Sequence, residues 1–192
     1  MSKGRLRVGV IGCGGIAQMM HLPFLEKNAD RFEIAALCDL SDNVLSALAK
    51  RYHLPDTGCF TDYRMMLKQN LDAVLVTSGG DHTPQVRAAL LSGAHVFVEK
   101  PLCYTQAQAL ELGRLAQEQK LKLMVGYMKR YDPAYQRARQ LLAGLGELRY
   151  VQLNTLHPEE EGYLYFQGLI QADDVAPETI RHLRAQEDQA IT

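Results

Sequence analysis

The chain has 192 residues, a length that suits one ordinary domain with a further piece appended. Its 21 basic and 22 acidic side chains and its 47% hydrophobic content exclude a disordered chain and a disulfide-dense miniprotein. No apolar run reaches the roughly 18 to 20 residues of a membrane span, and the N-terminus lacks a signal-peptide pattern. The four cysteines lack metal-ligand spacing, so we expect a reduced, cytoplasmic protein without a membrane partner.

Charge is unevenly distributed along the chain. Residues 1–156 carry a net charge of +5, whereas residues 157–192 carry a net charge of −6. A mildly basic body suits a small anion such as a pyrophosphate. It lacks the clustered lysines and arginines that a nucleic-acid partner requires.

Short runs rich in β-branched residues predict a series of parallel strands. The runs are apolar without strict alternation, as expected for strands that are covered on both faces. The predicted strands are 5–11, 33–38, 73–77, 95–98 and 121–125.

Segments with helical spacing separate these strands, and Asp42 and Thr105 are the expected N-caps of two of them. Strands that alternate with helices predict right-handed crossovers, and hence a doubly wound α/β domain with a mainly parallel sheet over residues 1–125. The predicted helices are 15–27, 42–52, 62–69, 83–92 and 105–119.

The pattern changes after residue 125. A helix is predicted over 132–143, an alternating strand over 148–155, an acidic loop over 158–161 and a terminal helix over 177–190. One strand forms no stable sheet alone. Residues 126–192 are therefore predicted either to pack on the first domain or to begin an incomplete second α/β domain, which we favour.

The motif G-x-G-x-x-A directly follows the first predicted strand. Gly12 allows a tight turn, Gly14 lets the backbone approach a pyrophosphate, and Ala17 keeps the helix close to the sheet. The amides of Gly14, Gly15 and Ile16 are expected at a helix N-terminus, where the helix dipole favours an anion.

Asp39 ends the second predicted strand, 22 residues beyond Ala17. A carboxylate at that place can hold an adenosine ribose diol, and it repels a 2′-phosphate. No arginine follows within residues 40–43, so NAD is the favoured cofactor and NADP the alternative. The plainer interpretation is a glycine turn with a surface aspartate.

Two further clusters follow predicted strands. Thr77, Ser78 and His82 lie at the end of one strand, where ligands of open α/β sheets gather, although the same loop suits a simple helix N-cap. Glu99 and Lys100 follow an apolar strand, where a charged pair is costly unless it is paired or faces a cleft. A desolvated lysine can act as a base; the alternative is a structural ion pair.

Three segments together resemble the Gfo/Idh/MocA family of dinucleotide-dependent oxidoreductases. They are the glycine loop, HVFVEKP at 95–101 and GYMKRYDPAYQRARQLL at 126–142; GELRYVQL at 146–153 also resembles that family's entry into its second domain. The resemblance implies a Rossmann domain followed by an α/β domain with an open sheet. It also implies oxidation or reduction of sugars, cyclitols or related polyols with NAD or NADP, and a homo-oligomer in the full-length form.

The resemblance also implies roles for individual residues. Lys100 becomes the active-site lysine, followed by a cis bond to Pro101, and Arg130 lies where the family chain returns towards the nicotinamide. Ser78 and Gly79 depart from the family's Thr-Pro-Asn-x-x-His element. With no metal site expected, the predicted cofactor-binding residues are Gly12, Gly14, Gly15, Ile16, Ala17, Asp39, Thr77, Ser78, His82, Glu99, Lys100 and Arg130.

The family's second catalytic pair, Asp-x-x-x-His, has no counterpart after Val151. Glu178 and His182 have a similar spacing, but we interpret them as a solvated helix face. We therefore expect a dehydrogenase chain that binds NAD but turns over poorly. The rival interpretations are a non-catalytic dinucleotide-binding sensor or partner subunit, and a scaffold with a vestigial pocket.

Overall fold

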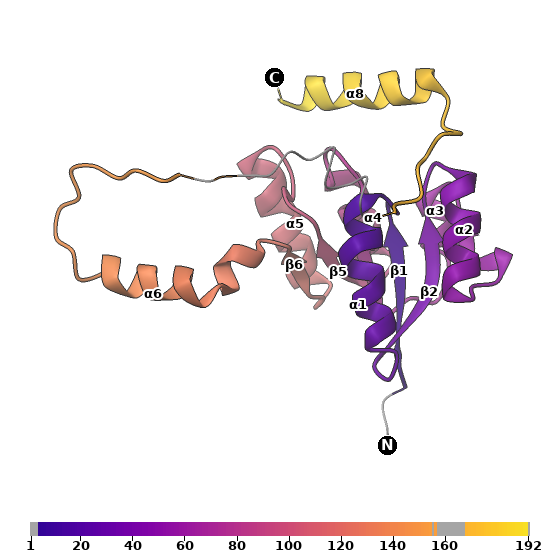
Figure 1. Cartoon of the computed structure of the whole chain (residues 1–192), viewed down its shortest axis with the longest axis horizontal. Helices are drawn as coiled ribbons and strands as arrows, with labels where there is room; N and C mark the ends of the chain where they lie inside the picture. The colour runs from indigo at the N-terminus through magenta and orange to yellow at the C-terminus, as the bar shows by residue number, and fades with distance from the viewer. Residues whose placement is uncertain (1–3, 155, 157–167, 192) are drawn as a thin grey trace.

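A single six-stranded parallel sheet forms the centre of the molecule, with the strand order β3-β2-β1-β4-β5-β6 (Figure 1). The structure is a computed structural model that describes residues 4–154, 156 and 168–191. The strands are β1 (Leu6–Ile11), β2 (Phe32–Cys38), β3 (Cys59–Phe60), β4 (Ala73–Val76), β5 (His95–Val98) and β6 (Leu123–Val125). This order confirms the predicted doubly wound α/β fold of the Rossmann type.

Helices connect successive strands and cover both faces of the sheet. The strand β3 has only two residues, too short for a sequence pattern, and it was missed. The helical segments are η1 (Ala17–His21), α1 (Leu22–Lys27), α2 (Asp42–Tyr52), η2 (Asp56–Gly58), α3 (Tyr63–Met66), α4 (Thr83–Leu91), α5 (Gln106–Glu118), η3 (Met128–Tyr131), α6 (Pro133–Leu142) and α8 (Pro177–Ile191).

The core consists of two apolar clusters, one on each face of the sheet. Val8 and Val10 of β1 and Leu37 of β2 pack with residues of α1 and α2. Their neighbours along the same strands, Ile11 and Ala36, pack with residues of α3, α4 and α5. Successive strand residues point to opposite faces, which explains why these strands are apolar without alternation.

Side-chain caps fix where the helices begin. Thr105 caps α5 in a capping box with Gln108, as predicted. The predicted N-cap of α2 was wrong by one residue: Ser41 has the extended backbone of a cap, and its hydroxyl accepts a hydrogen bond from the Val44 N–H at 3.1 Å. Asp42 is instead the first residue of the helix.

The predicted strand over 148–155 is also wrong. Residues 148–154 have no regular secondary structure, because no other strand lies beside them among the described residues to complete a ladder. Residue 155 and the predicted acidic loop 158–161 lie outside the described residues. The helix predicted over 177–190 is confirmed as α8.

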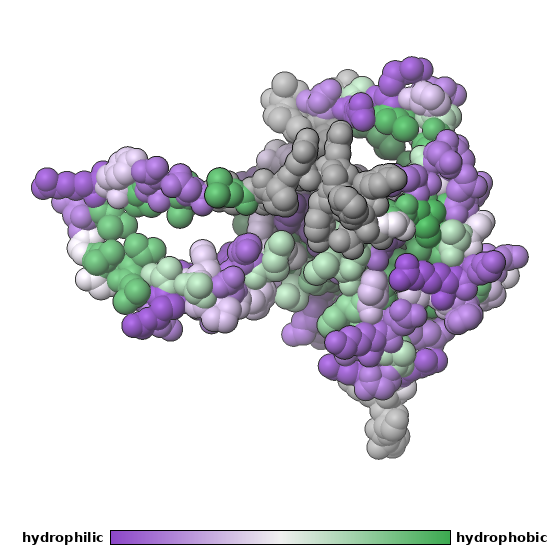
Figure 2. Space-filling view, viewed as in Figure 1, coloured by the Kyte–Doolittle hydropathy of each residue, from purple (hydrophilic) through white to green (hydrophobic). Residues whose placement is uncertain are grey.

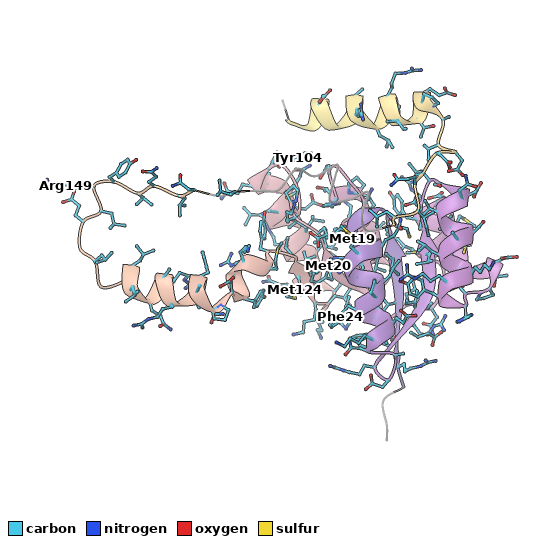
Figure 3. All side chains as sticks on the ribbon, in the orientation of Figure 1. Met19, Met20, Phe24, Tyr104, Met124 and Arg149 are labelled. Carbon is cyan, nitrogen blue, oxygen red and sulfur yellow. The ribbon has the colours of Figure 1, made fainter. Side chains whose placement is uncertain are left out.

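An arm formed by α6 and residues 143–154 extends away from the sheet, with Arg149 at its far end (Figures 1 and 3). The arm exposes several large apolar side chains, and Figure 2 shows hydrophobic residues along it. They include Leu141, Leu142, Leu145, Leu148 and Leu153. An exposed apolar surface of this kind is typical of an interface.

The topology brings the functional loops together. The order of strands reverses between β1 and β4, and in such sheets ligands bind outside the carboxyl ends of the strands at that point. Every predicted site residue follows a strand at this carboxyl edge. No helix in the described part of the chain is long and apolar enough to cross a membrane.

Packing of α5 against the sheet gives a direct test of the core. Leu112 is fully buried, whereas Leu110 on the same helix is 53% exposed. We expect Leu112→Ala to lower the free energy of unfolding by about 2–5 kcal/mol, and Leu110→Ala by less than about 0.5 kcal/mol. Urea denaturation followed by circular dichroism measures both, and equal losses would contradict this placement of α5.

Candidate functional site

The loop after β1 turns in contact with the loop after β4. Gly12 has a φ of +85°, and a Cβ at this position would come within 2.4 Å of the Ser78 backbone nitrogen. The Gly12 N–H donates to the Cys38 carbonyl at 2.8 Å, and the Thr77 hydroxyl donates to the Gly12 carbonyl. Only glycine fits here, so the tight turn predicted at Gly12 is confirmed.

The next turn of the loop is open to solvent. A Cβ at Gly14 would meet nothing within 4 Å, and both Gly14 and Ile16 are exposed. Helical backbone begins at Gly15, so the first N–H groups of this turn have no partner inside the helix. Open space beside free donors at a helix N-terminus fits a pyrophosphate.

Asp39 lies beside this loop. One carboxylate oxygen accepts a hydrogen bond from the Cys13 N–H at 2.7 Å, and the other accepts one from the Ser41 N–H at 3.0 Å. The half-buried carboxylate is thereby fixed between the phosphate loop and the start of α2. This is where an adenosine ribose attached to the pyrophosphate would need a partner.

The cluster after β4 divides into two roles. Thr77 and His82 hold the structure: the His82 ring is buried, with its nitrogens 2.6 Å from the carbonyl oxygens of Ser78 and Pro101. Both ring nitrogens of His82 are therefore engaged by the protein's own backbone. Ser78 differs, because its hydroxyl is buried without a hydrogen-bond partner in the described structure.

Glu99 and Lys100 follow β5 at the same edge. The Lys100–Pro101 peptide bond is cis, and the Lys100 side chain is exposed. Glu99 is held by His21, whose Nε2 lies 2.8 Å from one carboxylate oxygen, while the other accepts the Lys100 N–H at 3.2 Å. The ion-pair partner of Glu99 in the described structure is thus His21, and not the Lys100 side chain as the alternative interpretation of this pair expected.

His21 is a site residue that sequence reasoning missed, since it was treated as a helix residue without chemistry. It ends the π-helical turn η1, which holds one residue more than an α-helical turn and shifts the residues after it around the helix. Its ring also packs edge-on against Phe97 of β5, with centroids 5.4 Å apart. Nothing in the local pattern indicates a partner 78 residues away.

Arg130 is not joined to this group. It lies in η3 with an exposed side chain, and no hydrogen bond or ion pair in the described structure links it to the other predicted site residues. Glu178 and His182 are exposed on α8. In the described part of the chain, no group of three or more histidine, cysteine, aspartate or glutamate side chains could hold a metal ion.

The cysteines are unsuited to nucleophilic chemistry. Burial raises the pKa of the Cys13 thiol well above its usual range, and the nearby Asp39 carboxylate adds to this shift. Burial likewise raises the pKa of Cys38 to about 12. All four cysteines are free, and a neutral thiol is a poor nucleophile.

A separate cavity lies at the opposite edge of the sheet. It has a volume of about 560 Å³ and is lined at the amino ends of β1 and β2 by residues that include Arg7, Glu33 and Tyr52. None of the predicted site residues lines it. The carboxyl edge, with its open glycine turn and fixed acid, has the features of a dinucleotide-binding Rossmann domain.

Comparison with known proteins agrees. Residues 6–127 match the model of the GFO_IDH_MocA family, described as an oxidoreductase family with an NAD-binding Rossmann fold, and the chain belongs to this family. It is 34% identical over 140 residues to an inositol 2-dehydrogenase/D-chiro-inositol 3-dehydrogenase of Shouchella clausii. That match covers 71% of this chain and 40% of the relative, so the chain spans less than half of that protein.

Solved structures give the same result. A scyllo-inositol dehydrogenase of Lactobacillus casei with bound NAD(H) and scyllo-inositol matches with a TM-score of 0.64 and 25% identity, over 72% of this chain and 41% of that one. KijD10, a 3-ketoreductase of Actinomadura kijaniata in complex with NADP, matches with a TM-score of 0.64 and 31% identity, over 73% and 44%. Similar structures thus hold either dinucleotide.

Alanine substitutions at the two glycines of the loop should have different effects, one on stability and the other on NAD affinity. Gly12→Ala places a methyl group against the Ser78 backbone and should destabilise the fold by about 2 kcal/mol or more. Gly14→Ala places its methyl group in open space, so stability should change by less than about 1 kcal/mol while NAD affinity falls about ten-fold or more. Thermal unfolding and titration calorimetry separate the two effects. Equal NAD affinity in Gly14→Ala and the wild type would contradict this placement of the pyrophosphate.

Proposed function

We propose that this chain is the cofactor-binding part of an NAD-dependent oxidoreductase that acts on the CH–OH group of a sugar, cyclitol or related polyol. The observation that carries the proposal is the open turn at Gly14, which lies at the same sheet edge as Asp39 and Lys100. The inositol dehydrogenases among its relatives support this class of substrate.

The roles of the residues follow from their positions. The amides of Gly14, Gly15 and Ile16 bind the pyrophosphate, and Asp39 orients the adenosine ribose. The Ser78 hydroxyl, which lacks a partner among the described residues, donates to the cofactor. When bound, NAD supplies the hydride acceptor.

Lys100 moves the proton. Lys100 is placed to take up the hydroxyl proton when the substrate's carbinol carbon gives its hydride to the bound cofactor, so that the alcohol becomes a carbonyl. Glu99 fixes the backbone N–H of Lys100, and His21 fixes Glu99. Arg130 remains a candidate for the nicotinamide side of the pocket. These residues bind the cofactor and move the proton, but they contribute little to orienting the substrate.

The domain division is part of the proposal. Residues 1–125 form the dinucleotide-binding domain, and residues 126–192 form the beginning of a C-terminal α/β domain for substrate binding and oligomerisation. The exposed leucines of the arm support this, because they leave an apolar surface without cover in the described structure. We also propose a homo-oligomer for the full-length protein and a cytoplasmic location, which the four free thiols support.

Lys100 also discriminates between an enzyme and a mere dinucleotide sensor, because binding alone gains little from this amine. Titration calorimetry should detect NAD binding to the wild type, and Lys100→Ala should change that affinity by less than about three-fold. With NAD and a panel of polyols, the wild type should form NADH slowly, and Lys100→Ala should lower this rate about 100-fold.

Each result bears on one claim. If neither NAD nor NADP binds the wild type, the proposed function fails. If the slow NADH formation is unchanged in Lys100→Ala, the lysine has no catalytic role and the sensor interpretation gains. An exposed lysine remote from the edge, Lys50→Ala on α2, is the matched control.

A further inference from the structure

A segment from the acidic end of the chain lies beside the loop after β1 and the start of α2, at the carboxyl edge of the sheet. We call residues 168–174 the strap; it passes the carboxyl end of β1 on its way to α8 (Figure 1). Ile170 is tied to Gln18, the residue after Ala17: its carbonyl accepts the Gln18 amide at 3.0 Å, and its N–H donates to the Gln18 oxygen at 2.9 Å. The Ile170 side chain packs on the apolar cluster under α1 and α2.

The strap ends on the first turn of α2 with two aspartates. The Asp174 carboxylate accepts hydrogen bonds from the Ser41 hydroxyl and from the Asn43 N–H, the latter at 3.0 Å. Asp173 accepts one from the Asn43 side-chain amide at 2.8 Å. A carboxylate at a helix N-terminus is favoured by the helix dipole.

These contacts bring negative charge next to Asp39. Ser41, which donates its hydroxyl to Asp174, also donates its backbone N–H to Asp39 at 3.0 Å. The hydrogen bonds from Ser41 and Asn43 lower the pKa of Asp174 below its usual value, so this carboxylate is ionised at neutral pH. The carboxylates of Asp39, Asp173 and Asp174 therefore lie around the start of α2, whose first residue is a fourth acid, Asp42.

The strap borders the cofactor edge without filling the phosphate turn. A Cβ at Gly14 would still meet nothing within 4 Å, so the pyrophosphate position stays open. The strap instead accepts hydrogen bonds from the donors beside Asp39. The Ser41 hydroxyl and the Asn43 N–H could otherwise bind an anion at the adenosine ribose, and both are taken by Asp174.

We propose that Asp174, supported by Asp173, is a specificity-determining residue that excludes the 2′-phosphate of NADP and so selects NAD. The inference rests on the proposed function, because it requires a dinucleotide in this crevice. A 2′-phosphate next to Asp39 needs hydrogen-bond donors or positive charge. Here it meets a second carboxylate that already holds the available donors. NAD has only a hydroxyl there and is spared this repulsion.

The test is the ratio of the two affinities. In titration calorimetry with NAD and NADP, Asp174→Asn should raise the NADP affinity about five-fold or more and change the NAD affinity by less than about two-fold. Asp173→Asn should act in the same direction with a smaller effect. Asp30→Asn removes the same charge from the loop before β2, at the opposite edge of the sheet, and should change neither affinity.

Two further measurements separate selection from simple structural support. Raising the salt concentration should reduce the difference between the NAD and NADP affinities of the wild type, because salt screens repulsion between charges. The same increase in salt should change this difference less in Asp174→Asn, which lacks one of the charges. Gln18→Ala removes both hydrogen bonds to Ile170 while keeping every carboxylate. It also removes the hydrogen bond that the Gln18 amide donates to the Cys13 carbonyl at 2.8 Å, so its readout is the NADP affinity relative to the NAD affinity, which should rise.

The failures are distinguishable. If the wild type binds NAD but Asp174→Asn leaves the ratio unchanged, or weakens both dinucleotides equally, the strap does not select the cofactor and the inference falls. If the wild type binds neither dinucleotide, the proposed function itself falls. Circular dichroism of each variant checks that it is folded.

Discussion

The close approach of the turn after β1 to the backbone after β4 determines where everything else in the site can lie. It exists because position 12 has no Cβ, and it is locked by the bonds from Gly12 to Cys38 and from Thr77 to Gly12. Three strands are thereby joined at the point where the sheet changes direction. The helix that follows begins at the crevice with its first N–H groups unpaired inside the helix, which gives an uncharged loop affinity for an anion.

The same helix then connects the two halves of the site. Its π-helical turn brings His21 to Glu99, and Glu99 holds the backbone of Lys100. The segment that would bind the pyrophosphate and the residue that would move the proton therefore belong to one hydrogen-bonded unit. In catalysis, a displacement of about 1 Å between these groups is costly, and a shared helix limits it.

What the sequence predicts well is local. The glycine spacing, the Thr105 cap and the five longer strands depend on residues within a few positions of one another, and the structure confirms them. His21 was missed because its partner, Glu99, lies 78 residues away. The hydrogen bond from Ser41 to Asp174 spans 133 residues and is equally absent from the local pattern, whereas the cap that Ser41 forms on α2 is a local feature misplaced by one residue. The strand over 148–155 failed for the opposite reason: its alternation is real, but a ladder also needs a neighbour, and a single strand's own sequence does not show whether one exists.

The strap also gives a physical meaning to the uneven charge of the chain. An acidic tail and a basic body would attract each other without any fixed geometry, and screened surface charges contribute little. Here Ile170 enters the apolar cluster and fixes the position of the two aspartates that follow, so their charges act at one helix N-terminus. Burial of Ile170 thus fixes the position of the two aspartates, and their charge is what we propose discriminates NADP from NAD. The strap, although it lies far along the chain from the sheet, thus contacts both the helix after β1 and the first turn of α2, at the edge where we propose that the adenosine ribose binds.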